Sequence, residues 1–203
     1  MVLWTTDRVL WSSYFNPLDF VPSIATGAGS TSILAVNSAI TQCVPLGADF
    51  IIYTTSNAVS ARKTNDFASP YIFAEIPSSA GVIYDRHIAN NSNNGVHIVW
   101  TASGFQQVTA QAAEYIFPEL SEGISRGLRS TINPIYQQPE LIREAALDVS
   151  LSFASNRMLC ISTAKSGIGY YTDCYVLDTS LGRWGKLTCN HSTMLEYLSL
   201  IHI

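Results

Sequence analysis

Apolar and polar residues alternate along much of this chain in short segments, which is the pattern of β-strands that are half buried in sheets. The clearest example is DVSLSF within Leu147–Ser155, and Asp49–Thr55 and Val96–Ala102 are predominantly apolar segments of similar length. Clusters of glycine, proline, asparagine and serine separate such segments and predict turns. The pattern therefore predicts an all-β protein whose strands follow one another through short connections.

The predicted strands group into sets of four, and a set of four strands in about 40 residues is typical of one blade of a β-propeller. Upstream of these sets, Arg8–Ser13 predicts a further strand and Ser23–Ser32 predicts a loop rich in glycine, serine and threonine. A short helical insertion, residues 121–146, separates the second and third sets. We therefore expect a partial β-propeller of about three four-stranded antiparallel blades, at residues 40–76, 81–120 and 147–189.

Two sequence echoes support an internal repeat. Ile51–Asn57 (IIYTTSN) returns as Ile98–Gly104 (IVWTASG), and Tyr71–Ser79 (YIFAEIPSS) returns as Tyr115–Gly123 (YIFPELSEG). The echoes keep their order and nearly their spacing. A unit of this length buries its apolar face only by stacking on its neighbours. We therefore expect the echoed segments to be equivalent strands of successive blades.

Both ends of the chain are predicted to be cuts in a longer protein. The last six residues, Leu198–Ile203 (LSLIHI), can be encoded by CTGTCTCTTATACACATC, which resembles a transposon-end adapter used for sequencing libraries. Met1 reads equally well as an internal methionine. This interpretation gives one propeller-like domain over residues 1–197, a fragment of a larger protein, followed by an adapter-derived tail over residues 198–203.

The composition limits the classes of partner. Charged residues make up 13% of the chain and the formal net charge is −4, whereas about 25% charged residues is usual. Such a low charge suits either a packed β protein with a neutral surface or a subunit that neighbours cover. No basic stripe is present to neutralise phosphates, so no sequence-specific nucleic-acid binding is expected. No apolar run approaches the length of a membrane helix, so no membrane partner is expected.

The four cysteines give no metal-binding or redox motif. Cys43, Cys160, Cys174 and Cys189 form no C-x-x-C pair, and no histidine lies at ligand spacing from them. Free buried thiols in a reducing compartment are the favoured interpretation. A disulfide among the last three remains the alternative, because all three lie in strand-like segments.

Catalytic signatures are absent from the sequence. It contains no nucleophile elbow, no phosphate-binding loop, no H-E-x-x-H and no dinucleotide fingerprint. Asp85, Arg86 and His87 form a polar cluster in a strand-like segment, and we favour a salt bridge at a blade edge over acid–base chemistry. We therefore assign no catalytic, cofactor-binding or metal-binding residue, expect no cofactor, and predict that the protein is not an enzyme.

The remaining histidines and the paired glutamates have structural explanations. His97 lies in an apolar strand and is expected to be an inward or edge residue with its hydrogen bonds satisfied, His191 lies near the predicted cut, and His202 is predicted to come from the adapter. Glu75 and Glu119 occupy equivalent positions of the second echo. As a pair they suggest glycoside hydrolysis, but the repeat itself explains them.

Four tryptophans admit two interpretations. They form either a sugar-binding platform or, as we favour for a β protein, packing between blades. The segment Tyr175–Leu187 predicts a blade ending, with Asp178 capping a turn through Gly182 and Trp184 packing against the next blade. The tryptophans are Trp4, Trp11, Trp100 and Trp184.

Several of these segments resemble a family of bacteriophage virion proteins, the propeller-containing tail proteins of short-tailed phages of the tail tubular or nozzle kind. The resemblance covers most of Arg8–Leu187, and its most specific parts are Trp11–Phe20 (W-S-x-x-x-x-P-x-D-F) and the Asp178–Trp184 blade ending. The other matching segments are GADFIIYTTSNAVSA, VHIVWTASGFQQVT and EYIFPEL.

The resemblance implies a structural role in the virion without enzymatic activity. Proteins of this kind form a ring below the portal, and DNA leaves through the channel that they enclose. The implied partners are other tail and portal subunits and further copies of the chain in a homo-oligomeric ring. The implied location is the phage tail, after assembly in the cytoplasm of the bacterial host.

Two other functions remain open. The aromatic content and the aligned glutamates favour a carbohydrate-binding or carbohydrate-cleaving propeller. The segment Tyr175–Trp184 also resembles the end of a kelch blade, although the Gly-Gly doublet usual in kelch blades is missing.

Overall fold

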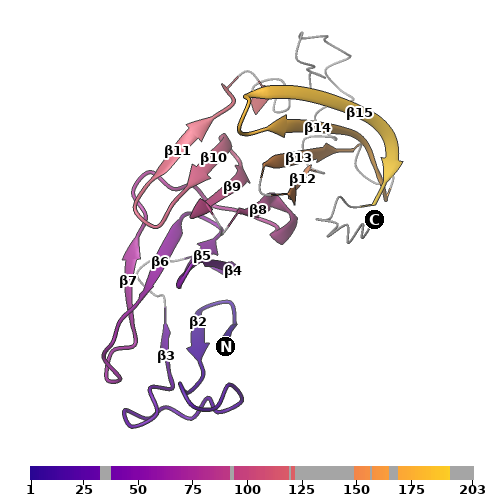
Figure 1. Cartoon of the computed structure of the whole chain (residues 1–203). Helices are drawn as coiled ribbons and strands as arrows, with labels where there is room; N and C mark the ends of the chain where they lie inside the picture. The colour runs from indigo at the N-terminus through magenta and orange to yellow at the C-terminus, as the bar shows by residue number, and fades with distance from the viewer. Residues whose placement is uncertain are drawn as a thin grey trace, which may run out of the picture.

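The computed structural model describes residues 1–32, 38–91, 94–118, 120–121, 149–155, 157–164 and 169–192. Within these residues the chain forms four antiparallel sheets, and each sheet is made from strands that are consecutive in the sequence. The all-β prediction is confirmed. Figure 1 shows the sheets following one another along an arc, and the described residues do not close this arc into a ring.

The strands of each sheet are arranged in chain order. The N-terminal sheet contains β1 (Val2–Trp4), β2 (Arg8–Trp11) and β3 (Gly29–Ser32). The second sheet contains β4 (Ile40–Leu46), β5 (Asp49–Thr54), β6 (Ala58–Lys63) and β7 (Tyr71–Glu75). The third sheet contains β8 (Ile88–Asn91), β9 (Val96–Thr101), β10 (Gly104–Val108) and β11 (Ala113–Ile116). The fourth sheet contains β12 (Val149–Ser155), β13 (Met158–Thr163), β14 (Tyr171–Asp178) and β15 (Arg183–His191).

The three predicted sets of four strands correspond to the second, third and fourth sheets. The start of the middle set was predicted wrongly, because residues 81–84 form no strand and Asp85–His87 form a short 3₁₀-helix, η2, before β8 begins. This segment crosses from the outer strand β7 to the inner strand β8. It is held by a hydrogen bond from the Val82 N–H to the Thr54 carbonyl, 2.9 Å long. Most of the predicted insertion, residues 122–146, and the predicted tail lie outside the described residues.

The N-terminal sheet was only partly predicted. The segment Ser23–Ser32 was expected to be a loop, but its last four residues form β3 and pair with β2. The reason is the packing of Trp11, whose ring covers Gly29 so closely that a Cβ there would lie 2.8 Å from a ring carbon. Glycine and serine favour turns on their own, so the contact with Trp11 decides this strand.

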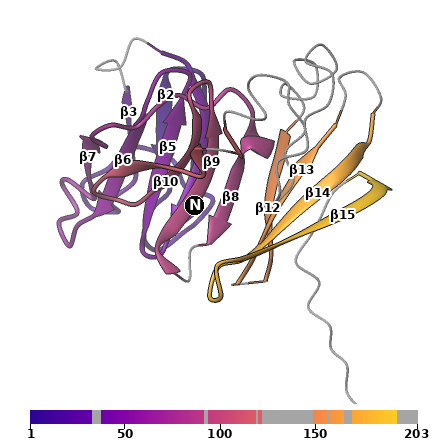
Figure 2. The ribbon, with the colours of Figure 1, turned by 90° about the horizontal axis from the view of Figure 1, so that it is seen from above.

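Each sheet packs one face against the next, and a separate apolar cluster fills each gap. Val9 of the N-terminal sheet packs with Phe50 and Ile52 of the second sheet, and all three are buried. The gap between the second and third sheets contains Tyr53 and Val99. The gap between the third and fourth sheets contains Trp100, Phe105, Leu159 and Ile161. Seen from above, β8 and β12 lie side by side where the last two sheets meet (Figure 2).

The first sequence echo marks equivalent hairpins, as predicted. The Thr54 hydroxyl donates to the carbonyl of Asn57 at 2.9 Å, and the Thr101 hydroxyl donates to the carbonyl of Gly104 at 2.8 Å. In each turn the same hydroxyl accepts the N–H of the serine two residues later, at 3.2 Å. The Thr-x-Ser echo is therefore a repeated turn that closes the second strand onto the third strand of each sheet.

The second echo is out of register, which corrects our prediction. The first echo makes Val59 equivalent to Gln106. Glu75 pairs with Val59, whereas the residue opposite Gln106 is Tyr115. Glu119 follows the end of β11 and lies outside the described residues. The cause is the position of the hairpin turn, because β10 pairs with β11 only as far as Val108, the equivalent of Ala61, whereas β6 pairs with β7 as far as Lys63.

Candidate interaction surface at the N-terminal sheet

The loop between β2 and β3, residues 12–28, is held in one conformation by its own hydrogen bonds. The Ser13 N–H donates to the Asp19 carbonyl at 2.8 Å, and the Tyr14 N–H donates to the Thr26 carbonyl at 3.0 Å. The indole Nε1–H of Trp11 donates to the Gly27 carbonyl at 2.9 Å. The loop is therefore tied to both flanking strands and to the apolar gap beneath it.

Two short polar side chains shape the tip of this β2–β3 loop. The Asn16 side-chain oxygen accepts the N–H of Leu18 at 3.0 Å, and the Asp19 carboxylate accepts the N–H of Val21 at 3.0 Å. Such turns give the backbone N–H groups hydrogen-bond partners within the loop, so the large side chains that follow can point outward.

The β2–β3 loop presents large apolar side chains to solvent. The exposed fractions are 76% for Phe15, 79% for Leu18, 70% for Val21 and 73% for Ile24. Phe67, from the loop between β6 and β7, stacks on Phe15 with ring centroids 6.2 Å apart. Single exposed apolar residues are ordinary, but four large ones on one loop, together with the stacked Phe67, favour a surface that binds another molecule.

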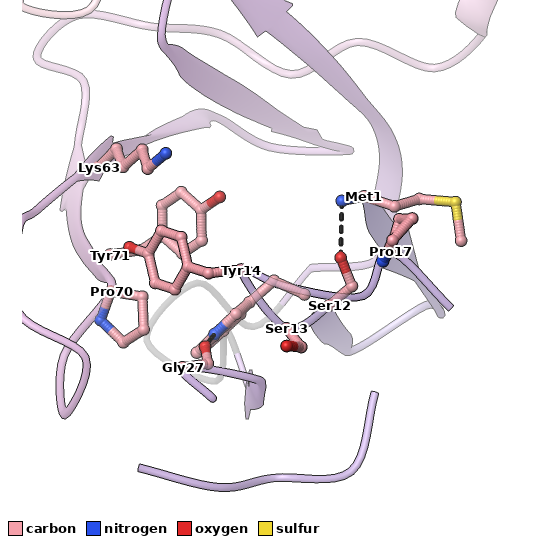
Figure 3. A pocket seen from close by; sticks show the side chains of 10 residues that line it. Met1, Ser12, Ser13, Tyr14, Pro17, Gly27, Lys63, Pro70 and Tyr71 are labelled. Carbon is pink, nitrogen blue, oxygen red and sulfur yellow. Dashed lines mark hydrogen bonds between the residues drawn. The ribbon is translucent and has the colours of Figure 1, made fainter. Parts of the chain in front are cut away.

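A pocket of about 240 Å³ lies at the base of the β2–β3 loop (Figure 3). Its lining includes three aromatic and two proline side chains, serine hydroxyls and two cationic groups. The Lys63 ammonium lies 5.0 Å from the centre of the Tyr14 ring, and the Met1 amino group donates to the Ser12 hydroxyl at 2.8 Å. Burial, helped by Tyr14 and Asp49, raises the pKa of Tyr71, so its hydroxyl stays neutral. A group with both apolar and polar atoms suits this pocket. Its main lining residues are Trp11, Tyr14, Pro17, Lys63, Pro70 and Tyr71.

The polar cluster Asp85–His87 lies on η2 and not on a strand. The guanidinium of Arg86 lies 4.4 Å from the centre of the Tyr84 ring, and that ring also contacts His87. Burial, with a smaller contribution from Arg86, lowers the pKa of His87 to about 4. His87 is therefore neutral near pH 7, which does not match a general acid–base group working there.

His97 has the position that the sequence predicted. Its side chain is fully buried, its Nδ1 accepts the Tyr53 hydroxyl at 2.9 Å, and its Nε2–H donates to the Pro45 carbonyl at 2.9 Å. His191 ends β15, where its Nε2 lies 2.9 Å from the Ser162 hydroxyl. His202 lies outside the described residues.

The structure does not bring together the residues that suggested sugar chemistry. Glu75 is exposed and accepts a hydrogen bond from the Asn57 amide at 2.7 Å. Trp11 and Trp100 are buried in different gaps, which confirms the packing interpretation for both. Trp184 packs on Phe117 of the preceding sheet, with ring centroids 5.1 Å apart, and not on a following blade as predicted. Its sheet is the last one in the described residues, so the preceding sheet is its available neighbour.

The four cysteines are free, as predicted. Cys160 and Cys174 are buried on neighbouring strands, Cys43 is half buried, and Cys189 is exposed, contrary to the expectation of burial. Interaction with the Cys174 thiol lowers the pKa of Cys160, and the same interaction raises the pKa of Cys174.

No metal site or membrane helix is found in the part of the chain that the structure describes. No group of three or more histidine, cysteine, aspartate or glutamate side chains there could hold a metal ion. No helix among the same residues is long and apolar enough to cross a membrane.

No protein-family model matches this chain, and no curated protein is significantly similar to it in sequence. Sequence reasoning also missed the exposed loop as a surface. The available signal was the segment Tyr14–Ile24 (YFNPLDFVPSI), which combines many large apolar residues with residues that form turns.

Proposed function

We propose that this protein is a non-enzymatic structural subunit of a bacteriophage tail, of the tail tubular or nozzle kind, and that its four sheets are part of a β-propeller. The resemblance in Trp11–Phe20 and Asp178–Trp184 supports the assignment to phage. The arc of four sheets stacked face to face is compatible with successive propeller blades. The expected partners are copies of the same chain and other tail and portal subunits.

The observation that carries this proposal is the ordered β2–β3 loop with its exposed apolar side chains. Leaving Phe15 and Leu18 in water has a cost, because burying a side chain of this size stabilises a protein by roughly 1.5–3 kcal/mol. The loop is held in place by internal hydrogen bonds, so collapse of the loop cannot hide these side chains. A subunit that is covered by neighbours in an assembly accounts for both the exposure and the low charge.

Sequencing the DNA that flanks this reading frame in its source would test the assignment to phage. Genes for a portal or capsid protein beside the frame, and further repeats within the frame, are the expected result. A frame surrounded by metabolic genes would contradict the assignment.

The assembly role is testable on the protein itself. A double variant, Phe15→Ser with Leu18→Ser, should weaken self-association of the chain, measured by sedimentation velocity and by negative-stain electron microscopy of rings. The matched control is Leu181→Ser, because Leu181 is 61% exposed on the turn between β14 and β15, in the fourth sheet. A chain that remains monomeric at all concentrations, with or without the loop variant, would argue against a homo-oligomeric ring.

The pocket gives a second candidate function. Tyr14, Tyr71 and Trp11 contribute aromatic surface, and Lys63 and the serine hydroxyls supply polar groups, which together suit a sugar. A carbohydrate-binding propeller would bind on a glycan array and lose that binding on Tyr14→Ala. Binding to none of the glycans on the array would remove the candidate.

A further inference from the structure

The N-terminal sheet has three strands, whereas each of the other three sheets in the described residues has four. The first strands of successive sheets, β1, β4, β8 and β12, contact one another along the inner side of the arc (Figure 1). In the complete sheets the fourth strand, β7, β11 or β15, forms the outer edge. The strand that the N-terminal sheet lacks is therefore the outer one, beside β3.

The hydrogen-bond register shows which groups face this empty position. The Ser12 N–H donates to the Met1 carbonyl and the Thr5 N–H donates to the Arg8 carbonyl, so the even-numbered residues of β2 bond towards β1. Backbone groups alternate in direction along a strand, so Val9 and Trp11 bond to their partners Thr31 and Gly29. The N–H and carbonyl groups of Ser30 and Ser32 consequently point away from β2.

The outer edge of β3 has none of the features that protect an open strand. Natural edge strands carry charged residues, prolines or bulges, which prevent pairing with other chains. The outer strands of the complete sheets follow this rule, because β7 contains Glu75, β11 contains Glu114 and β15 contains Arg183. Strand β3 reads Gly-Ser-Thr-Ser, is uncharged and is regular, and Ser30 is exposed.

Aromatic side chains beside the empty position are only partly covered. Between the third and fourth sheets, Trp184 of the outer strand β15 covers Phe117, which directly follows the outer strand β11. In the N-terminal sheet no outer strand is present among the described residues. Tyr71 and Phe73 of β7 instead meet Trp11 of β2, with ring centroids 5.5 Å and 5.9 Å apart, and both stay half buried.

We propose that the outer edge of β3 is an acceptor site for a β-strand from a partner chain. The partner is an extended segment that runs antiparallel to β3, pairs with Ser30 and Ser32 through its backbone, and places an aromatic or aliphatic side chain towards Tyr71 and Phe73. Every strand in the described residues already belongs to a sheet, so none of these strands supplies the missing one. Main-chain pairing supplies the affinity and the alternate side chains supply the selectivity, as in other cases of strand addition. The inference goes beyond the phage assignment and does not depend on it.

The test uses a synthetic peptide with the sequence SPYIFAEIP, residues 69–77, which contains the outer strand of the second sheet. Amide hydrogen exchange of the whole chain is followed by NMR with and without an excess of this peptide. Exchange at Ser30 and Ser32 should slow at least tenfold when the peptide is present at ten times its Kd or more. Exchange at Thr31 should not change, because its N–H already bonds to β2.

Two controls keep the result specific to the strand edge. The same peptide N-methylated at alternate residues should give no protection, because its backbone donors are blocked. The variant Ser30→Pro should abolish protection at Ser32, whereas Ser30→Ala, which keeps the N–H, should preserve it. The methylated peptide decides the question even if Ser30→Pro does not fold.

Unchanged exchange at Ser30 and Ser32 in the presence of the unmodified peptide would overturn the proposal. Slow exchange without the peptide that is independent of protein concentration would also overturn it, because a segment of the same chain would then occupy the edge. Protection that grows with protein concentration would support the proposal and identify a second copy as the partner chain.

Discussion

The hydroxyl of Tyr53 in the second sheet donates a hydrogen bond to Nδ1 of His97 in the third sheet, at 2.9 Å. The other ring nitrogen of His97 donates to the carbonyl of Pro45 in the second sheet. Tyr53 and His97 are fully buried, so the pair is a satisfied polar link within an otherwise apolar gap. Because the imidazole has one partner at each nitrogen, the link also fixes the tautomer of His97.

Removing this hydroxyl should destabilise the protein although the ring remains. Tyr53→Phe leaves Nδ1 of His97 buried without a donor, which costs about 1–3 kcal/mol. Urea unfolding followed by tryptophan fluorescence would measure the loss. Tyr115→Phe is the matched control, since Tyr115 is 56% exposed and should change the free energy of unfolding by less than about 0.5 kcal/mol. If both substitutions changed the free energy of unfolding equally, the hydrogen bond between Tyr53 and His97 would not contribute to stability.

The stability of the protein should fall as the pH drops below neutrality. Burial lowers the pKa of His97 to about 4, from 6.5 in the unfolded chain, so the unfolded state binds more protons between these values. The stabilising contribution is therefore complete above pH 6.5 and is lost as the pH falls through about 4. The free energy of unfolding should decrease by roughly 2 kcal/mol for this residue between pH 7 and pH 5.

The variant His97→Phe isolates this contribution. It should be less stable than the original chain at pH 7, but its stability should depend less on pH between 7 and 5. His87 remains in the variant and keeps its own dependence of the same sign, because burial also lowers its pKa. An unchanged pH dependence in His97→Phe would show that the imidazole is already protonated, or accessible to protons, in the folded state.

Gly81 should tolerate no side chain. A Cβ at this position would lie 2.0 Å from the Thr55 carbonyl oxygen, and backbone cannot move aside as a flexible side chain can. Gly81→Ala should cost at least about 3 kcal/mol, the upper range for overpacking. Gly47→Ala is the control, because Gly47 has open space and a φ of +65°, and should cost only about 1 kcal/mol for its left-handed backbone. Thermal unfolding would compare the stabilities of the two variants. Equal losses of stability would contradict the close contact between Gly81 and the Thr55 carbonyl.

Asp178 should titrate far below the usual range for a carboxyl group. The Ser180 hydroxyl makes the largest contribution, followed by backbone N–H groups of the turn and by Arg157, and together they lower the pKa of Asp178 to about 2. An NMR titration of the side-chain carboxyl carbon would measure it. Ser180→Ala should raise the pKa of Asp178 more than Arg157→Gln does, and the reverse order would assign the effect to the ion pair.

Local patterns in the sequence predicted the strands well where the pattern of apolar and polar residues and the flanking turn residues indicated the same strand bounds. The segment Ala58–Lys63 was predicted to the residue, because regular turns bound it on both sides. The Thr-x-Ser echo marked true equivalents, since the threonine hydroxyl closes the turn by bonds within a few residues. The inward orientation of His97 followed from its apolar neighbours in the strand.

Features that depend on distant residues were not predictable in this way. Strand β3 depends on the packing of Trp11 over Gly29, and the crossover before η2 depends on the contact of Gly81 with Thr55. The second echo misled because register is set by where the hairpin turn begins and not by similar residues in the strand that follows it. The β2–β3 loop was missed as a surface because its composition alone does not show exposure, whereas its internal hydrogen bonds hold the apolar side chains in solvent.

The arrangement of every sheet from one uninterrupted stretch of chain has a consequence for synthesis. Each meander forms by local pairing of consecutive strands, which is fast compared with joining distant segments. A chain leaving the ribosome can thus complete one sheet before the next has been made. The apolar face of each sheet is then exposed only until the next sheet, a few dozen residues later, has been synthesised and packs against it. Folding therefore proceeds in the direction of translation. If translation paused or stopped between two sheets, the apolar face of the last completed sheet would stay exposed. This aggregation-prone intermediate is the one that chaperones would need to protect.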